Sequence, residues 1–244
     1  MRGISVLQST DSTNDDVRRL AASGAPEGTV VIASSQSAGR GRLGRSWASP
    51  DRLGLYLSLL LRPHEPQEQI GRYALAAAVA VAEAARSFAG DRVVLKWPND
   101  VMADGRKLAG ILAELRQGSS GAELVLGVGL NVDQREEDFP DELGGRATSL
   151  RLLRDGAGLD REGVAAEVLR SLASVFLQLR TEGWPGVAER FLRYAPDATG
   201  RRVLVPSGAV GVTCGLDASG ALRIETAGGI VLAHASESVT LLEE

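Results

Sequence analysis

The residues from Gly39 to Trp47 carry the strongest chemical signal in the sequence. They read Gly-Arg-Gly-Arg-Leu-Gly-Arg-Ser-Trp and lie shortly after the apolar run Thr29–Ala33. Glycine at this density disfavours both helix and strand, so we expect a loop whose backbone can approach a ligand closely. Guanidinium groups match phosphate and carboxylate oxygens, and a tryptophan can cover a flat ring. The segment predicts an anion-binding loop, although its composition also fits a solvated surface loop or a nucleic-acid-binding segment.

A second cluster, Lys96-Trp97-Pro98-Asn99-Asp100, is followed by Lys107 seven residues beyond its aspartate. Strand-like pieces flank the turn residues 103–105, so we expect a hairpin that presents the ammonium of Lys107 and the carboxylate of Asp100 to one ligand. A lysine ammonium about 4 Å from a phosphoryl oxygen contributes about 4 kcal/mol at an effective dielectric constant of about 20, before desolvation is subtracted. The carboxylate suits Mg²⁺ shared with phosphates. A surface ion pair at a hairpin also fits these two residues.

Three polar residues, Ser12, Thr13 and Asn14, precede an expected helix over 15–22 that ends before Gly24. Serine, threonine and asparagine are common caps of helix N-termini. Because one cap needs one side chain, the other two remain available to a ligand.

Composition excludes several classes of protein. The 244-residue chain is 44% hydrophobic and 24% charged, which fits a globular protein with one core and a small appended domain. Its net charge of −4 and its lack of a signal-like or membrane-length apolar segment predict a cytoplasmic protein that binds no DNA and no membrane. A single cysteine, Cys214, excludes an internal disulfide, and two separated histidines, His64 and His234, exclude a three-histidine zinc site. The run Gly127-Val128-Gly129 lacks the third glycine of a Rossmann fingerprint, and no P-loop motif is present.

Hydrophobic periodicity predicts an α/β fold in which strands and helices are mixed. The expected strands cover 29–34, 55–61, 93–97, 108–115 and 124–130, and the expected helices cover 15–22, 67–88, 160–180 and 185–194. A hairpin connection is expected at 117–121. After Gly200 short apolar pieces alternate with turn residues, which predicts five short strands in a small barrel. The domains are therefore expected at 1–198 and 199–244.

The motifs, in this order and spacing, resemble those of the biotin protein ligases. The resemblance covers roughly residues 9–135 and rests on Ser12-Thr13-Asn14, Gln36, Gly39–Trp47, Lys96–Asp100, Arg106–Gly110 and Gly129-Leu130-Asn131. It implies a catalytic domain with a mixed sheet, like that of class II aminoacyl-tRNA synthetases, followed by a small SH3-like β-barrel. It also implies two steps, in which the carboxylate of biotin attacks the α-phosphate of ATP and an acceptor lysine then displaces AMP from biotinyl-5′-AMP.

The resemblance also assigns roles to residues of this sequence. It implies a biotin site made of Ser12, Thr13, Asn14, Gln36, Arg40, Gly41, Lys107 and Gly110. It implies a nucleotide site made of Gly39, Arg42, Arg45, Trp47, Asn99 and Asn131. Lys107, Arg42 and Asp100 are the implied catalytic residues, and Asp100 is also the implied ligand of Mg²⁺.

Partners follow from the same resemblance. The implied acceptor is a biotin carboxyl carrier protein of a biotin-dependent carboxylase, and homodimers occur in the family. Some members carry an N-terminal DNA-binding domain, whereas only a short segment precedes Ser12 here, so a monofunctional ligase is expected. Two alternatives stay open. One is a lipoate–protein ligase, and the other is a non-catalytic module that binds nucleic acid or another anion.

Overall fold

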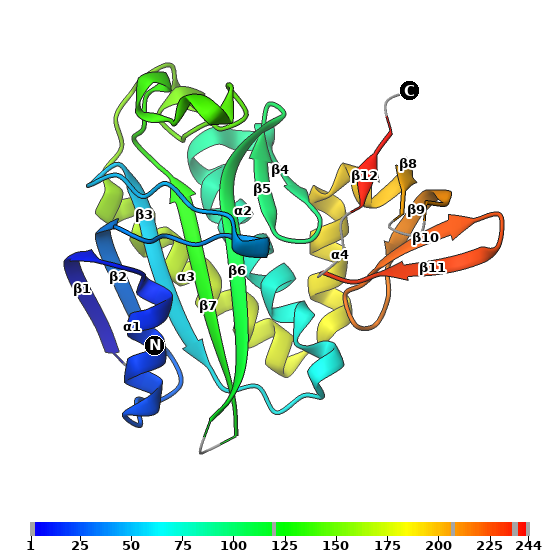
Figure 1. The fold of residues 1–244 in the computed structure, drawn as a ribbon, viewed down its shortest axis with the longest axis horizontal. Helices are drawn as coiled ribbons and strands as arrows, with labels where there is room; N and C mark the ends of the chain where they lie inside the picture. Colours follow the sequence, from blue (N-terminus) through cyan, green and yellow to red (C-terminus); the bar gives the residue numbers. More distant parts are fainter. Residues whose placement is uncertain (1–2, 119–120, 206–207, 236–238, 243–244) are drawn as a thin grey trace.

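The computed structural model describes residues 3–118, 121–205, 208–235 and 239–242. A seven-stranded sheet forms its centre, in the order β1-β2-β3-β7-β6-β5-β4 (Figure 1). The strands are β1 (Gly3–Thr10), β2 (Thr29–Gln36), β3 (Gly54–Leu61), β4 (Val93–Lys96), β5 (Asp100–Ala103), β6 (Arg106–Gly118) and β7 (Gly121–Asn131). β1 and β2 run parallel and the other neighbours run antiparallel, so the predicted mixed sheet is confirmed. Ser119 and Ser120, the centre of the expected hairpin connection, lie outside the described residues.

The two faces of this sheet are covered differently. Helices α2 (Gly71–Ala89), α3 (Arg161–Thr181) and α4 (Trp184–Tyr194) lie on one face, and α1 (Thr13–Ala22) lies on the other (Figure 1). Strand β3 is buried on both faces, and its residues Leu55, Leu57 and Leu59 join the main core, which includes α2. Leu60 instead packs with Val17 of α1 in a small second cluster. Because side chains alternate along a strand, the remaining even-numbered positions of β3 face the same side as α1.

Two glycines, Gly110 and Gly129, lie side by side on the face of the sheet that α1 covers. The strand register aligns Tyr56, Gly129, Gly110 and Asp100 in one row across β3, β7, β6 and β5. A Cβ atom on Gly129 would lie 2.5 Å from the indole nitrogen of Trp47, and one on Gly110 would lie 3.2 Å from Cζ3 of the same ring. The indole therefore rests directly on the backbone of β6 and β7.

A second sheet follows α4 along the chain. It consists of β8 (Thr199–Leu204), β9 (Val210–Leu216), β10 (Leu222–Thr226), β11 (Gly229–Ala233) and β12 (Thr240–Leu241), in the order β11-β10-β9-β8-β12. The five predicted strands are present. No pairing among the described residues joins β11 to β12, so the sheet is open there, and closure into an SH3-like barrel stays a prediction.

The second sheet packs against the first part of the chain beside α4 (Figure 1). The indole nitrogen of Trp97 donates to the carbonyl of Gly220 at 3.2 Å, and that of Trp184 donates to the carbonyl of Asp217 at 3.2 Å. Residues of both parts also share the main apolar core. The domain boundary at 199 falls where β8 begins and stays a prediction.

The structure differs from the sequence-based expectations in two places. β1 was not predicted, because as an edge strand it leaves Ile4 and Val6 exposed and lacks the pattern of a buried strand. The long helix does not begin at 67: residues Gln67–Gln69 form a separate 3-10 turn, and α2 begins at Gly71. The first residues of that segment lie on the surface and bury no apolar face, whereas the predicted end at Gly90 is confirmed.

We expect Gly129→Ala to displace the indole of Trp47, because the new methyl group would overlap the ring. Overpacking of this kind lowers the free energy of unfolding by about 1–3 kcal/mol. Chemical denaturation measures that change, and tryptophan emission should shift to longer wavelength as the ring enters solvent.

Gly3→Ala is the matched control, because Gly3 also lies in a strand and a Cβ atom there meets nothing within 4 Å. It should leave stability and emission unchanged. The emission shift should also vanish in a Trp47→Phe background. Unchanged emission and stability in Gly129→Ala would contradict the packing described.

Candidate active site

A cleft of about 1160 Å³ opens on the glycine-lined face of the main sheet. The start of α1, the Gly39–Trp47 segment (the Arg/Gly loop), the Lys96–Asp100 segment and parts of 134–147 line it, together with β6 and β7. The structure brings every predicted site residue except Gly39 to this cleft. Gly39 instead begins the loop, where it packs so closely against the end of the loop that a Cβ atom would overlap the carbonyl of Trp47.

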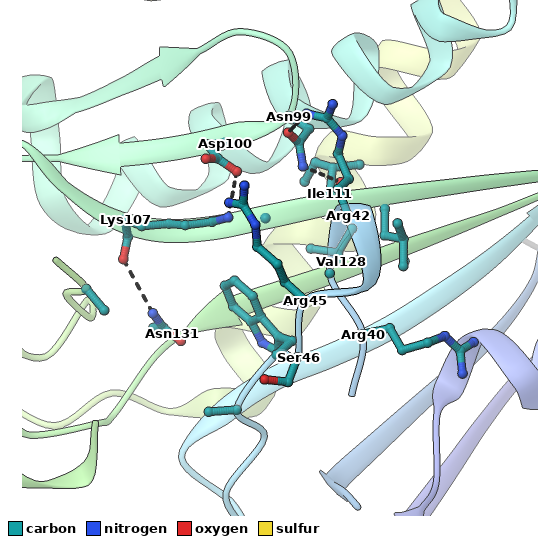
Figure 2. Close-up of a pocket in the computed structure, with 18 of the residues that line it drawn as sticks. Arg40, Arg42, Arg45, Ser46, Asn99, Asp100, Lys107, Ile111, Val128 and Asn131 are labelled. Carbon is teal, nitrogen blue, oxygen red and sulfur yellow. Dashed lines mark hydrogen bonds and ion pairs between the residues drawn. The ribbon is translucent and has the colours of Figure 1, made fainter. Parts of the chain in front are cut away.

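A β-bulge brings Lys107 and Asp100 to the same side of the β5–β6 hairpin. Opposite Val101 and Met102, strand β6 carries one extra residue, Leu108, which is fully buried. The extra residue resets the alternation of side chains, so Lys107 faces the cleft with Asp100. Its Nζ lies 2.7 Å from Oδ1 of Asp100 (Figure 2). The turn predicted between the two strands is confirmed.

The Lys107–Asp100 pair is part of the cleft wall. The two side chains are 35% and 27% exposed, and the ammonium lies 5.4 Å from the centre of the Trp47 ring. The backbone of Lys107 is held on both sides, since its N–H donates to Arg146 at 2.8 Å and its carbonyl accepts from Thr148 at 2.9 Å. The pair is therefore held more firmly in place than a mobile ion pair on the surface.

Arg42 joins the Arg/Gly loop to two other parts of the chain. Its guanidinium donates to Oδ1 of Asn99 at 2.7 Å and to the carbonyl of Ala235. The amide of Asn99 is fixed in turn, because its Nδ2 donates to the carbonyl of Ile111 at 2.8 Å. The pKa of the Arg42 guanidinium is lowered overall. Burial is the largest cause, the carboxylate of Asp100 partly offsets it, and the positive charge of Arg45 adds to it. Arginine nevertheless stays charged, because its ordinary pKa lies far above neutral.

The Arg/Gly loop folds back on itself, as the prediction of a loop requires. The N–H of Gly41 donates to the carbonyl of Arg45 at 2.7 Å, and Leu43 at the tip has a φ of 57°. Arg45 extends toward the Lys107–Asp100 pair (Figure 2). Three cationic side chains thus gather around one carboxylate, and this end of the cleft suits an anion of several charges.

The opposite end of the cleft, here called the polar end, is a network of hydroxyl, amide and backbone groups that extends to the carboxylate of Glu114. The backbone N–H of Thr13 donates to Oε1 of Gln36 at 2.9 Å, and its hydroxyl lies 3.1 Å from the same oxygen. The hydroxyl of Ser58 lies 2.7 Å from that of Thr13 and 2.6 Å from Oδ1 of Asn14. Nδ2 of Asn14 donates to Glu114 at 2.6 Å. Ser12 occupies the helix N-cap, but its side chain makes no capping hydrogen bond.

Arg40 borders the polar end. Its two terminal nitrogens donate to the two oxygens of Asp15 at 2.7 and 2.8 Å, and the side chain points away from Lys107 and Asp100 (Figure 2). The structure therefore separates Arg40 from the other two arginines of the loop.

Asn131 ends β7 close to the backbone of Lys107. Its Nδ2 donates to the carbonyl of Thr148 at 2.9 Å and lies 3.5 Å from that of Lys107. Its Oδ1 accepts from Nε2 of Gln134 at 3.1 Å. The side chain is thus held in a single orientation.

Among the polar residues in or beside the cleft that sequence reasoning missed are Ser58, Glu114 and Gln134. Ser58 is the one small polar residue in the apolar run 55–61, and Glu114 is a charge within the expected strand 108–115. Each was a detectable signal, since a polar residue in an apolar strand needs a partner. Gln134 lies outside any periodic segment and gave no such signal.

The described residues form neither a cluster of metal ligands nor a membrane-spanning helix. Within the described ranges, no group of three or more His, Cys, Asp or Glu side chains could hold a metal ion. No helix in the described part of the chain is both long and apolar enough to cross a membrane.

Comparison with known proteins identifies the family. Residues 6–131 match the biotin/lipoate A/B protein ligase family. The biotin–[acetyl-CoA-carboxylase] ligase of Mycobacterium tuberculosis is 39% identical over 247 residues, which cover 98% of this chain and 90% of that protein. The bifunctional ligase/repressor BirA of Bacillus subtilis is 38% identical over 228 residues, which cover 92% of this chain and 69% of that protein.

A solved structure agrees over the whole fold. The biotin protein ligase from Aquifex aeolicus in complex with biotin and ATP superposes with a TM-score of 0.84 at 30% identity, covering 99% of this chain and 100% of that one. Sequence and structure therefore place this chain in the biotin/lipoate A/B protein ligase family.

Proposed function

We propose that this protein joins biotin to a lysine of a biotin carboxyl carrier protein at the expense of ATP. The observation that carries the proposal is the arrangement of the cleft, in which a polar end and a cationic end that holds Lys107 share a floor of glycine. Close relatives named as biotin ligases, and a similar structure that contains biotin and ATP, support the same function.

The reaction has two steps. An oxygen of the biotin carboxylate attacks the α-phosphorus of ATP, the bond to the bridging oxygen breaks, and pyrophosphate leaves. The neutral amine of the acceptor lysine then attacks the acyl carbon of biotinyl-5′-AMP, loses a proton and displaces AMP. Lys107 lies at the cationic end beside Asp100, and we expect its ammonium to contact both the carboxylate of biotin and the α-phosphate of ATP. There it would stabilise the charge that grows in the transition state.

The polar end would bind the ureido ring of biotin. Ser12, Thr13, Asn14 and Gln36 supply donors and acceptors. Ser58 holds the side chains of Thr13 and Asn14, and Gln36 is held by Thr13. A ligand that left such buried groups unpaired would lose about 1–3 kcal/mol for each. Arg40 and Gly41 border this end. Gly110, whose missing side chain lets Trp47 and Lys107 lie close to β6, is the remaining residue that we assign to the biotin site.

The cationic end would bind the nucleotide. Arg42 and Arg45 would contact phosphate oxygens, with Asn99 fixing Arg42, while Trp47 and Asn131 would lie toward the adenine and Gly39 would let the loop pack. One carboxylate, Asp100, faces this end, and Mg²⁺ commonly takes one or two carboxylates plus phosphate oxygens. Asp100 therefore fits an ion shared with the nucleotide, which would neutralise phosphate charge when bound.

The finer features of the fold are proposed on the same basis. We assign residues 1–198 to a catalytic domain of the class II aminoacyl-tRNA synthetase type and 199–244 to an SH3-like domain. The match with the Aquifex aeolicus enzyme over nearly the whole chain supports both assignments. Because the reaction consumes ATP and modifies a metabolic carrier, we propose a cytoplasmic location; homodimers known in the family make self-association a further proposal.

Biotin is expected to drive pyrophosphate release from Mg²⁺-ATP, and lipoate is not. Release should be measured with each acid separately, and a carrier domain added to each mixture should be analysed by mass spectrometry. A biotin-sized mass increase on one lysine is the expected product. Turnover with lipoate alone would move the assignment to lipoate ligation, and no turnover with either would favour a binding module.

Lys107→Ala is expected to reduce biotin-dependent pyrophosphate release by two or more orders of magnitude, on the order of the loss of one oxyanion-type donor. The melting temperature should change little, because Lys107 is partly exposed. Arg116→Ala is the matched control, since it removes a cation from the far end of the same strand. Near-normal release by Lys107→Ala would remove Lys107 from this role.

Arg42→Gly is expected to form biotinyl-5′-AMP but to release it into solution. The substitution removes the contacts that tie the loop to Asn99 and Ala235, so the loop should no longer retain the intermediate. Chromatography after filtration would separate free from retained intermediate. Wild-type retention in the variant would show that Arg42 does not hold the loop closed.

A further inference from the structure

The short connection between β4 and β5 lies at the cationic end of the cleft. It consists of Trp97, Pro98 and Asn99, all of which line the cleft. One side of the connection is tied to β6. The backbone N–H of Ile111 donates to the carbonyl of Asn99 at 2.9 Å, and Nδ2 of Asn99 donates to the carbonyl of Ile111 at 2.8 Å. Asn99 then offers its Oδ1 to the guanidinium of Arg42.

The other side of the connection is tied to the second sheet. The indole nitrogen of Trp97 donates to the carbonyl of Gly220 at 3.2 Å, and the ring packs against the main core. An indole N–H can only donate and a backbone carbonyl can only accept, so this hydrogen bond has one possible direction. Trp97 thus joins the connection to a turn that lies 123 residues farther along the chain.

That turn, residues 217–220, is itself firmly held. Oδ1 of Asp217 accepts from both the backbone N–H and the hydroxyl of Ser219, at 2.8 Å each. Gly220 has a φ of 86°, and a Cβ atom there would lie 2.8 Å from Cδ1 of Leu75 in α2. The carbonyl of Gly220 is therefore a fixed point against α2.

The second sheet also reaches the cationic end directly. The guanidinium of Arg42 donates to the carbonyl of Ala235, which follows β11, as well as to Asn99. Val239, in the segment before β12, lines the cleft too. Both the guanidinium and the connection that orients it are thus held from the second sheet.

We propose that Trp97 is a positioning residue that transmits the docking of the second sheet to Asn99. The proposal rests on the proposed function, in which Arg42 contacts phosphate oxygens of ATP. With the indole hydrogen bond in place, the connection is anchored on both sides and Asn99 aims the guanidinium of Arg42 at the nucleotide. Without it, one side of the connection is free to shift, and a small displacement of a group that positions a reacting ligand slows the reaction.

Trp97→Phe is the test, because it removes the indole N–H and keeps an aromatic ring in the core. Biotin-dependent pyrophosphate release gives kcat and KM for Mg²⁺-ATP and KM for biotin. We expect kcat/KM for ATP to fall about five- to tenfold, as for the loss of one hydrogen bond. KM for biotin should stay unchanged, because the hydrogen bonds that order the polar end involve no residue of the connection.

Trp184→Phe is the matched control. The indole of Trp184, in α4, donates to the carbonyl of Asp217 in the same turn and at the same distance of 3.2 Å. Neither Trp184 nor its neighbours in the chain line the cleft. Both variants should lower the melting temperature, whereas only Trp97→Phe should change kcat/KM for ATP. The same kinetic loss in Trp184→Phe would reduce Trp97 to a structural contact and overturn the proposal.

A double-mutant cycle with Asn99→Ala tests the route. If Trp97 acts through Asn99, Trp97→Phe should cause no further loss of kcat/KM for ATP in an Asn99→Ala background. Losses that multiply in the double variant would mean that the two side chains act independently, contrary to the proposal.

A second variant approaches the same hydrogen bond from the other side. If Trp97→Phe does not fold, Gly220→Ala should displace the carbonyl, because its methyl group would overlap Leu75, and the same kinetic loss is expected. Gly208→Ala is the control for backbone strain, since Gly208 has a φ of 85° and a Cβ atom there would meet nothing within 4 Å. Equal kinetics in the two glycine variants would contradict the proposal.

The outcomes separate this inference from the ligase function. Turnover with biotin and a wild-type kcat/KM for ATP in folded Trp97→Phe overturns the inference while the ligase function stands. If neither biotin nor lipoate supports turnover, calorimetric binding of Mg²⁺-ATP replaces the rates. Weaker binding in Trp97→Phe but not in Trp184→Phe then upholds the inference without the ligase function, and equal or absent binding overturns it.

Discussion

The single extra residue on β6 is the constraint on which the cleft depends. With regular pairing, Lys107 and Gly110 would project from opposite faces of the strand, because they are separated by an odd number of positions. The bulge at Leu108 removes this conflict and buries Leu108 in the core. The ammonium, the carboxylate of Asp100 and the bare backbone of Gly110 then share one surface. A lysine on a regular strand could not meet a ligand lying on that glycine.

The glycine floor and the charged loop complement each other. Side chains at 110 and 129 would occupy the space of Trp47 and of any flat ligand, so the floor must be backbone. Glycine costs conformational entropy in a strand, about 0.5–1 kcal/mol relative to alanine. Here the pairing on both sides of β7 restrains that backbone, and the two glycines lie opposite each other in the ladder. The backbone at these two glycines is thus a flat and rigid surface, whereas the guanidinium groups of Arg42 and Arg45 above it belong to a loop.

Local sequence patterns predicted the parts of the site that lie close together in the chain. The turn between Asp100 and Lys107, the Arg/Gly loop and the polar residues at the start of α1 all follow from residue type and short spacing. The partners of those residues do not. Ser58 meets Asn14, and Asn14 meets Glu114, only because β3 and β6 place them on the face that α1 covers. Strand register sets these contacts, and a single sequence does not display register between distant strands.

Both ends of the cleft owe their hydrogen-bonding pattern to backbone groups. At the polar end the N–H of Thr13, which can only donate, fixes Oε1 of Gln36 toward it and turns Nε2 toward Ser49. At the other end the carbonyl of Thr148, which can only accept, fixes Asn131 and then Gln134. Side-chain amides can present either end to a ligand, but a backbone group cannot reverse. The orientations of these side-chain amides are therefore fixed when the chain folds, and a ligand cannot reverse the donors and acceptors that they present.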